Sequence, residues 1–370
     1  MDNNVKKKIL VLNTAGLATG GITTNMYNYL SRIIGPDICI DIVVTTVRDD
    51  VSINKFREIG CRLHFLPNRQ TELRAYSKAL YQLCRNEKYD AIHIHGSSRT
   101  LAIDLAIAYA ARRKMLRIVH AHNTTCDHIR AHKLLAPLFH RLSDVRLACG
   151  EAAGHWMYGD RNFLVIPNAI DTDSYKFDSA VRQEERLALG WQDNFVIGHV
   201  GFFSMVKNQS FIIDVFHELY QENNKYRLML MGDGELRQQV EQKVKEFGLQ
   251  HAVLFTGKIT DTHKRLSALD LVIMPSLYEG LPLVLIEQQA NGLNIVLSDT
   301  ISKETDKTGN LKYLSLKDNI SIWTQAVKSY VIDTDDERKE RSKKAIEDIT
   351  KAGYNIDTEV HKLRSIYLGH

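Results

Sequence analysis

Two carboxylates that lie eight residues apart form the most suggestive chemical pair in this sequence. Glu279 and Glu287 belong to the segment PSLYEGLPLVLIE, which directly follows the apolar run LVIM. That run is typical of a buried strand, and the apolar spacing over residues 283–291 predicts a helix. Glu279 and Gly280 are therefore expected in a strand-to-helix loop, where free backbone N–H groups at a helix N-terminus can hold an anion. One carboxylate could bond sugar hydroxyls and the other a ribose diol; the alternative is an N-terminal Glu favoured by the helix dipole and a surface Glu beyond it.

Two further loops are expected after strands in the second half of the chain. Gly201 and Lys207 lie in GFFSMVKN, which follows the apolar run FVIGHV, and Gly232 begins GDG after YRLMLM. A cation in the first loop is placed where it could bind a phosphate, although polar residues are common in strand–helix loops. Gly-Asp-Gly is typical of a tight turn, so it indicates a binding site only weakly.

Glycines and histidines occupy comparable positions in the first half of the chain. Gly20 and Gly21, in TGGI, open a predicted helix after the first strand, which suits a phosphate-binding loop. The spacing differs from GxGxxG and therefore disfavours a dinucleotide-binding dehydrogenase. His120, His122 and Asn123 end another predicted strand, in HAHN. A histidine there could bond a sugar hydroxyl or orient an acceptor, or it could be an ordinary loop or core histidine.

Two patterns that look like metal sites are better explained in other ways. Asp171 and Asp173 form a DxD sequence, but they follow PNAI in the stretch between the two halves and are more typical of a helix-capping turn. Cys126, His128 and His132 have a spacing loosely like that of zinc ligands, without a fourth ligand nearby. We therefore expect no metal site.

The alternation of strands and helices predicts an α/β fold with two Rossmann-like domains. Strands that alternate with helices form a parallel, doubly wound sheet. The pattern restarts at residues 195–200, after a polar, helix-prone stretch that contains no strand. We place the domains at residues 1–180 and 181–354, with a C-terminal helix at about 355–370 that could pack back on the first domain. Two such domains imply a cleft at the carboxyl ends of both sheets, where ligands of open α/β sheets bind.

Composition narrows the class of protein. The apolar fraction of 44% and the charged fraction of 25% are those of an ordinary soluble globular protein. The chain has five cysteines and no CxxC pair, which predicts reduced thiols in a cytoplasm and not a framework of disulfides. Neither a secretory signal nor a membrane-spanning run is expected from the apolar segments. Lys and Arg outnumber Asp and Glu in the first half, whereas acidic residues prevail in the second, so the first half is expected to meet an anionic partner.

One segment of the basic half combines positive charge with apolar residues. The stretch IRAHKLLAPLFHRLSDVR mixes basic with apolar side chains over residues 129–146. A basic amphipathic helix can lie on an anionic membrane. The more common alternative is a helix whose apolar stripe packs on its own sheet.

Several of these blocks, in this order, resemble the retaining glycosyltransferases of family 4, and particularly those of capsular and exopolysaccharide assembly. The resemblance covers nearly the whole chain, and its most specific part is PSLYEGLPLVLIEQQANG, which is similar to the E-x7-E block of the family. The supporting blocks are TGGI, HAHN, IPNAIDTDSY, VGFFSMVKN, LMGDGEL and LSDTISKE. The resemblance implies the GT-B fold, in which two Rossmann-like domains face each other across a cleft.

The resemblance also implies roles for individual residues on the donor side. Glu279 would lie beside the donor hexose, and Glu287 would hold the donor ribose. The backbone of Gly280 and Leu281 would meet the diphosphate, and Lys207 would supply the cation of the diphosphate clamp. Glu279, His122 and Lys207 are thus the expected catalytic residues.

Other positions follow from the same resemblance. Gly20 and Gly21 would line the phosphate and acceptor side of the cleft, and His122 would touch the sugar near the reacting carbon. The nucleotide base would rest near Lys258 and Ile259. The remaining expected site residues are Gly201 and Gly232 on the donor side, and His120 and Asn123 on the acceptor side.

One departure from the family pattern concerns the diphosphate clamp. The family usually has Arg directly after the glycine of this loop, whereas here Gly201 is followed by Phe202. An Arg side chain makes charge-assisted bonds to phosphate and Phe makes none. Lys207 and backbone N–H groups, or another cation, would have to hold the phosphates.

The expected activity is transfer of a hexose or N-acetylhexosamine, with retention, from a nucleotide-diphosphate sugar that is UDP-linked by family precedent. The expected acceptor is a saccharide or lipid-linked saccharide of cell-surface polysaccharide assembly, at the inner face of the plasma membrane. No cofactor, no metal and no nucleic acid partner are expected. The alternatives are a non-catalytic GT-B partner subunit, which Phe202 favours, and a nucleotide-sugar 2-epimerase of the same architecture.

Overall fold

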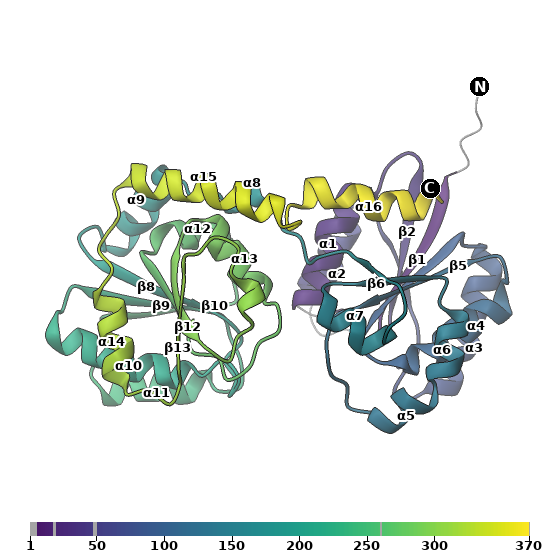
Figure 1. Cartoon of the computed structure of the whole chain (residues 1–370), viewed down its shortest axis with the longest axis horizontal. Helices are drawn as coiled ribbons and strands as arrows, with labels where there is room; N and C mark the ends of the chain where they lie inside the picture. The colour runs from purple at the N-terminus through teal and green to yellow at the C-terminus, as the bar shows by residue number, and fades with distance from the viewer. Residues whose placement is uncertain (1–5, 18–19, 47–49, 260, 370) are drawn as a thin grey trace. The chain divides into compact units, whose positions relative to one another are not determined.

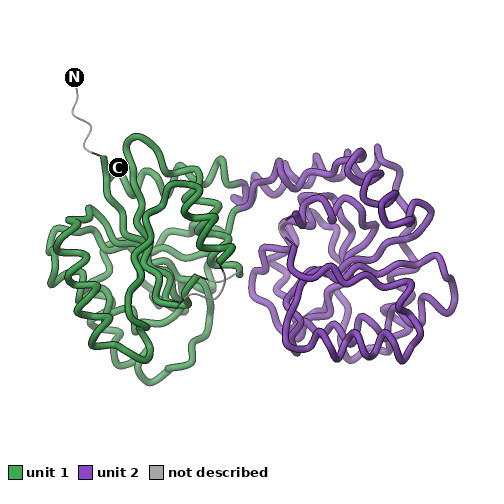
Figure 2. Tube along the Cα trace, turned by 180° about the vertical axis from the view of Figure 1, so that it is seen from behind, with its two compact units in different colours: residues 1–169, 356–370 green, residues 170–355 purple. Residues whose placement is uncertain are grey.

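The chain folds into two compact units, which are described here from a computed structural model covering residues 6–17, 20–46, 50–259 and 261–369. Unit 1 contains residues 1–169 and 356–370, and unit 2 contains residues 170–355 (Figure 2). The units divide between Ala169 and Ile170, whereas the boundary predicted from the sequence lies after residue 180. The earlier division follows from backbone pairing, because Ile170 N donates to Tyr354 O within unit 2.

Unit 1 is built on a seven-stranded parallel sheet with the strand order β3-β2-β1-β4-β5-β6-β7. Its central strands are buried along most of their length because helices cover both faces of the sheet (Figure 1). The strands are β1 (Lys7–Asn13), β2 (Ile38–Val44), β3 (Arg62–Phe65), β4 (Ala91–Gly96), β5 (Leu116–Ala121), β6 (Val145–Ala148) and β7 (Leu164–Val165). The helices are α1 (Gly21–Ile33), α2 (Asp50–Glu58), α3 (Leu73–Glu87), the 3-10 turn η1 (Arg99–Leu101), α4 (Ala102–Ala111), α5 (Ile129–Leu134), α6 (Ala136–Leu142), α7 (Glu151–Tyr158) and α16 (Ile356–Leu368).

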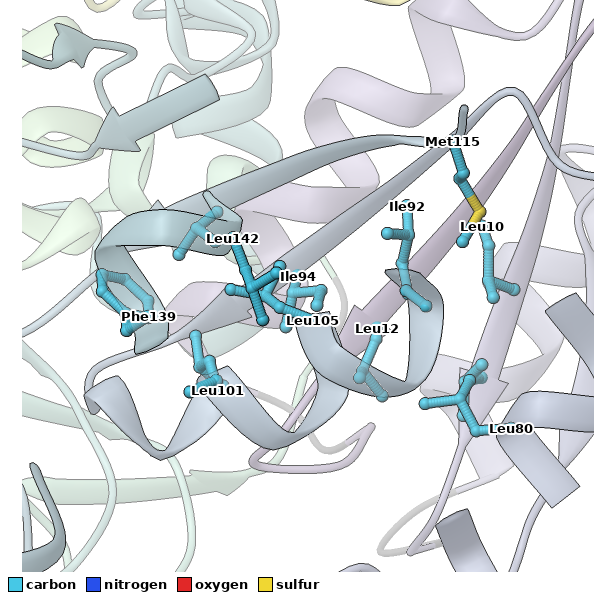
Figure 3. Packing of buried hydrophobic residues seen from close by; sticks show 14 of the residues in the cluster. Leu10, Leu12, Leu80, Ile92, Ile94, Leu101, Leu105, Met115, Phe139 and Leu142 are labelled. Carbon is cyan, nitrogen blue, oxygen red and sulfur yellow. The ribbon is translucent and has the colours of Figure 1, made fainter. Parts of the chain in front are cut away.

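Packing on one face of this sheet joins β1 and β4 to the helices above them. Leu12 and Ile94, from adjacent strands, lie in one buried cluster with Leu101 of η1 and Leu105 of α4 (Figure 3). Phe139 of α6 joins the same cluster and is fully buried. The opposite face is covered by α1, α2 and α16.

The last helix belongs to unit 1 although it follows unit 2 in the sequence. In Figure 1 the yellow helix α16 lies beside α1, and its residues Ile356, Val360 and Leu363 join the core under α1. Arg364 pairs with Asp37, which links the end of α16 to the loop before β2. The chain therefore crosses from unit 1 to unit 2 and back again.

Unit 2 is built on a six-stranded parallel sheet with the strand order β10-β9-β8-β11-β12-β13. The strands are β8 (Phe195–Val200), β9 (Tyr226–Met231), β10 (Val253–Gly257), β11 (Leu271–Met274), β12 (Asn294–Ser298) and β13 (Leu311–Leu314). The helices are α8 (Thr172–Tyr175), α9 (Ser179–Leu189), α10 (Gln209–Glu222), α11 (Arg237–Glu246), α12 (Thr262–Ala268), α13 (Leu283–Ala290), the 3-10 turn η2 (Lys303–Thr305), α14 (Ile320–Lys328) and α15 (Asp335–Lys351).

Both sheets confirm the predicted α/β class with two Rossmann-like domains, and each has a point where the strand order reverses. In unit 1 the reversal lies between β1 and β4, and in unit 2 it lies between β8 and β11. Loops that leave neighbouring strands in opposite directions open a crevice at the carboxyl ends of the strands, where ligands of such sheets bind. In the part of the chain that the structure describes, no helix has both the length and the apolar character needed to cross a membrane.

Candidate functional site

Lys207 and Glu279 meet at the strand-order reversal of unit 2. Lys207 lies in the loop after β8, Glu279 lies in the loop after β11, and Lys207 Nζ forms an ion pair with Glu279 Oε1. Both side chains are largely shielded from solvent, with 18% and 15% of their surfaces exposed. The sequence predicted each residue to lie in a loop at this edge, and the fold brings the two together.

Backbone contacts hold these two loops against each other. Leu277 N donates to Val206 O at 2.7 Å, and Asn208 Nδ2 donates to Pro275 O at 3.2 Å. Asn208 also ends the first loop in the left-handed backbone region, with φ of 55°. These hydrogen bonds therefore hold together the two loops that carry Lys207 and Glu279.

Gly232 packs against this arrangement from the neighbouring strand. It has φ of +137°, and a Cβ atom added there would lie 2.1 Å from Gly201 O. Gly234 is similarly close to Phe203, whose carbonyl oxygen would be 2.5 Å from an added Cβ. Both glycines of GDG are thus needed because the loop after β9 packs closely against the loop after β8. That second loop carries Lys207.

The start of α13 leaves open space beside Glu279. Gly280 is exposed, and a Cβ atom built on it meets no other atom within 4 Å. Leu281 is half-buried, and α13 begins at Leu283 after the N-cap Pro282. The first backbone N–H groups of the helix, with the partial positive charge of its N-terminus, suit an anion there.

Glu287 lies one turn into α13 and differs in environment from Glu279. Its side chain is 9% exposed and forms a hydrogen bond with Tyr175. Burial raises the pKa of Glu287 to about 7, and the hydrogen bond from the Tyr175 hydroxyl lowers this pKa by a smaller amount. Asn291 Nδ2 donates to Tyr175 O at 3.0 Å and so fixes the tyrosine that faces the carboxyl group. Tyr175 is not among the predicted site residues, because it is far from Glu287 along the chain.

The remaining donor-side positions lie at the same edge of the sheet. Lys258 is exposed and Ile259 is half-buried, directly after β10. Strand β9 separates β10 from β8, so these residues lie two strands away from the loop of Lys207. Phe202 is 55% exposed, whereas the adjacent Phe203 is fully buried and anchors the loop.

In unit 1, the predicted glycine loop opens α1 beside the strand-order reversal. Gly20 is the N-cap residue of α1, with an extended backbone, and both Gly20 and Gly21 are exposed. A Cβ atom built on Gly21 meets no atom within 4 Å, so the space beside it is free. Thr19 of the same motif lies outside the described residues.

Histidines of β4 and β5 gather on one face of the same sheet. His95 Nδ1 lies 2.8 Å from His122 Nε2, and the imidazole rings of His120 and His122 stack with centroids 4.4 Å apart. Burial lowers the pKa of His120 to about 4 and holds the pKa of His122 well below its usual range, so the rings are neutral near pH 7. The Nδ1 atom of His122 is buried without a hydrogen-bond partner.

The two predicted acceptor-side residues differ in exposure. His120 is 1% exposed and donates from Nε2 to Ile166 O, so it packs inside unit 1 and offers no surface to an acceptor. His120 lies in the layer that α1 and α16 cover, and its role on the acceptor side stays a prediction. Asn123, which follows the strand, is exposed.

The same histidine face contains a group that the sequence analysis did not anticipate. One nitrogen each from His93, His95 and His120 lies within 4.8 Å of the others, beside a cavity of about 10 Å³. Buried polar atoms without partners reach it from His93 Nε2, His120 Nδ1 and Asn25 Oδ1. The described residues that line the cavity include no Asp or Glu, and the cavity is about the size of one water molecule. The group is better suited to a bound water than to a metal.

The other metal-like patterns have structural roles. Asp171 is the N-cap residue of α8 and accepts from Ser174 N at 3.2 Å, which confirms the predicted capping turn. His132 is buried, and its ring lies against Trp156 with centroids 4.8 Å apart.

Substitution of the buried carboxyl group of Glu287 should stabilise the ligand-free chain in a pH-dependent way. The folded-state pKa of about 7 exceeds the ordinary glutamate pKa of 4.5, so the folded chain binds more protons than the unfolded chain between these values. The stability of the wild-type chain should therefore fall as pH rises from about 4.5 to 7, by on the order of 3 kcal/mol. Glu287→Gln removes this loss and should be more stable than wild type at pH 8 but not at pH 4.5, in urea unfolding followed by circular dichroism. The exposed Glu184→Gln is the matched control, and equal pH profiles for all three proteins would contradict the burial argument.

Comparisons with known proteins agree with this geometry. Residues 19–174 match the model described as Glycosyltransferase Family 4, and residues 181–348 match the model described as Glycosyl transferases group 1. The chain is 31% identical over 347 residues to the glycosyltransferase EpsF of Bacillus subtilis strain 168, covering 88% of each chain. It is 26% identical over 311 residues to the UDP-Gal:alpha-D-GlcNAc-diphosphoundecaprenol alpha-1,3-galactosyltransferase of Escherichia coli, covering 78% of each chain.

A solved structure with the same fold is Alr3699/HepE of Anabaena in complex with UDP and glucose. It superposes with a TM-score of 0.78 at 18% identity and covers 98% of this chain and 100% of its own. The identity with EpsF over most of both chains, with the two family models and the paired Rossmann-like sheets, establishes the family. The chain is a glycosyltransferase of family 4 with the GT-B fold.

Proposed function

We propose that this glycosyltransferase moves a hexose or N-acetylhexosamine, with retention of configuration, from a UDP-sugar to a saccharide or lipid-linked saccharide. The observation that carries the proposal is the Lys207–Glu279 ion pair at the strand-order reversal of unit 2, beside the N-terminus of α13. A cation, a carboxylate and free backbone N–H groups at one point suit a diphosphate that is joined to a sugar. The UDP and glucose bound to Alr3699/HepE and the name of the Escherichia coli relative support the choice of nucleotide.

Unit 2 would hold the donor through its diphosphate, its sugar and its ribose. The diphosphate takes Lys207 and the backbone of Gly201, Gly280 and Leu281. Glu279 then turns from the lysine to the hydroxyls of the sugar. The ionised carboxylate of Glu287 accepts from the ribose diol, and the base lies over the segment after β10, at Lys258 and Ile259.

The reaction exchanges one bond at the anomeric carbon for another. The acceptor hydroxyl attacks on the face from which the diphosphate departs, the bond from the anomeric carbon to the phosphate oxygen breaks, and the leaving phosphate takes the hydroxyl proton. Negative charge grows on the phosphate oxygens, where Lys207 and the α13 N-terminus stabilise it. Since the protein supplies this stabilisation, the proposal includes no metal or cofactor.

We assign the free nitrogen of His122 to the transferred sugar. His95 already holds Nε2 of His122, which leaves Nδ1 for a hydroxyl near the reacting carbon. Gly20, Gly21 and Asn123 would serve the phosphate and acceptor side, because all three are exposed at the carboxyl edge of the unit 1 sheet.

A second function, a non-catalytic GT-B subunit, is favoured only by Phe202. The exposed Phe202 cannot bond phosphate, so the clamp rests on Lys207 and backbone groups. We favour catalysis because Lys207, Glu279 and the open space at Gly280 remain together. A subunit that had lost its activity would not be expected to keep a cation and a carboxylate positioned in this way.

The acceptor and the location of the enzyme are inferred from α5 and α6. Ile129, Leu134 and Leu138 are exposed on these helices, together with three basic side chains, whereas Phe139 on the opposite face is buried. The exposed basic residues are Arg130, Lys133 and Arg141. An exposed face with apolar and basic groups suits an anionic membrane. We propose that the enzyme works in the cytoplasm at the inner face of the plasma membrane, in the assembly of cell-surface polysaccharide.

A nucleotide-sugar panel tests the donor. One UDP-sugar should raise the melting temperature of the full-length chain and be slowly hydrolysed to UDP without an acceptor, as detected by mass spectrometry. Glu279→Gln should lower this release by roughly a hundredfold, because the carboxylate beside the transferred sugar is lost. The exposed Glu235→Gln, in the neighbouring loop, should release UDP at the wild-type rate. Absence of binding and release across UDP- and GDP-sugars would favour the non-catalytic subunit.

A pair of leucine substitutions tests the membrane face. Leu134 on α5 is 80% exposed and Leu187 on α9 is 68% exposed, so glutamate at either position should leave the fold intact. Leu134→Glu should weaken flotation with phosphatidylglycerol vesicles, because it adds a negative charge to the face that would enter the lipid surface. Leu187→Glu should float as wild type does. Equal flotation of the two variants would exclude α5 as the membrane contact.

A further inference from the structure

Four basic side chains from separate elements of unit 1 gather near the end of α6. We call Arg99, His140, Arg146 and Arg161 the basic cluster. Arg99 lies in η1, His140 in α6 and Arg146 in β6, and Arg161 follows α7. The fold brings them together from positions that are far apart in the sequence, and none of them was selected as a site residue from the sequence.

The hydrogen bonds of the cluster go to neutral groups. Arg99 Nε donates to Met157 O at 2.8 Å, and Arg99 Nη2 donates to Trp156 O at 3.3 Å. Arg146 Nη2 donates to His140 O at 3.2 Å. Among the described residues, no Asp or Glu forms an ion pair with the three arginines of the cluster, whereas five other arginines of unit 1 each pair with an Asp.

Two nitrogen atoms of the cluster are buried and have no partner. They are Arg146 Nε and His140 Nδ1. A buried donor without a partner costs free energy, so such atoms usually face a ligand or a water. The two residues that carry these atoms are in contact, because Arg146 Nη2 donates to His140 O.

The cluster also contains unbalanced positive charge. Burial, with the charges of Arg161, Arg99 and Arg146, lowers the pKa of His140 to about 4. Burial and the charge of Arg161 lower the pKa of Arg99 as well. Like charges that are held together without a carboxylate favour the binding of an anion, and arginine is especially suited to phosphate oxygens.

The cluster adjoins the proposed membrane face. Helix α6 carries His140 on one turn and the exposed Leu138 and Arg141 beside it. A phosphate at the cluster would therefore lie close to the face of α6 that we propose rests on a membrane. A lipid chain attached to that phosphate would have the exposed Leu134 and Leu138 beside it.

We propose that the basic cluster binds the diphosphate of a lipid-linked saccharide and so holds the acceptor substrate. This assignment rests on the proposed function, because it names the residues that would hold the lipid-linked acceptor of that function. The cluster takes the phosphate oxygens, the lipid remains in the membrane, and the saccharide extends from the diphosphate towards the carboxyl edge of the sheet. Phosphate chemistry alone would also fit an ordinary anionic lipid headgroup, which the experiment below separates from the diphosphate.

The test measures binding of the full-length chain to phosphatidylcholine vesicles that carry a small fraction of undecaprenyl diphosphate, with saturating UDP present to occupy the Lys207 loop. Arg161→Gln is the main variant, because Arg161 is exposed and its loss should leave the fold intact. It should weaken binding to these vesicles about tenfold and leave binding to phosphatidylglycerol vesicles nearly unchanged. Arg146→Gln should have the same selectivity.

Arg141→Gln is the matched control, because it removes one positive charge from the exposed face of α6. It should weaken binding to both kinds of vesicle to a similar, smaller extent. The proposal is overturned if Arg161→Gln behaves like Arg141→Gln, or if it weakens binding to phosphatidylglycerol as much as to the diphosphate. The vesicle assay contains no donor sugar, so it does not depend on catalysis. If the protein binds the diphosphate selectively but never releases UDP from a UDP-sugar, only the proposed transferase activity is contradicted.

Discussion

The proposed donor site depends on the ion pair between Lys207 and Glu279. It joins the two loops that leave β8 and β11 in opposite directions, at the point where ligands of open α/β sheets bind. A lysine and a glutamate that are mostly shielded from water stabilise each other when no ligand is bound. In the proposed function a diphosphate replaces the carboxylate at Lys207, and Glu279 is released to the sugar. The pair would thus keep both groups in position before the donor arrives.

Burial gives the other candidate residues their chemical character. Glu287 is held near Tyr175 with a pKa of about 7, so a fraction of the chains must lose a proton before the carboxylate can accept from a ribose. His122 is neutral because it is buried among other histidines, and its bond to His95 leaves one nitrogen free. Both sites cost stability in the ligand-free chain, which is common where a protein is built to bind a ligand.

Much of the fold and part of the site could be predicted from the sequence, because apolar strands and loop glycines are local signals. The α/β class and the two Rossmann-like domains follow from runs such as KKILVLN and YRLMLM. Strand β13 and helix α15 were not predicted, because β13 is short and only partly buried and α15 buries a narrow stripe that includes Arg338 and Ser342. The contacts of Glu287 with Tyr175 and of His122 with His95 join residues that are distant in the sequence, so no local pattern could reveal them. The burial of His120 could not be predicted for the same reason, because its contacts with α1 and α16 join residues that are distant in the sequence.

A calorimetric titration of UDP into the wild-type chain, Lys207→Met and Glu279→Gln measures whether Lys207 binds the diphosphate in competition with Glu279. If Lys207 binds the diphosphate and Glu279 competes for it, Lys207→Met should weaken UDP binding by roughly tenfold or more. Glu279→Gln should bind UDP at least as tightly as wild type, because its side chain no longer neutralises the lysine. Wild-type affinity in Lys207→Met, or an equal loss of affinity in both variants, would contradict the account.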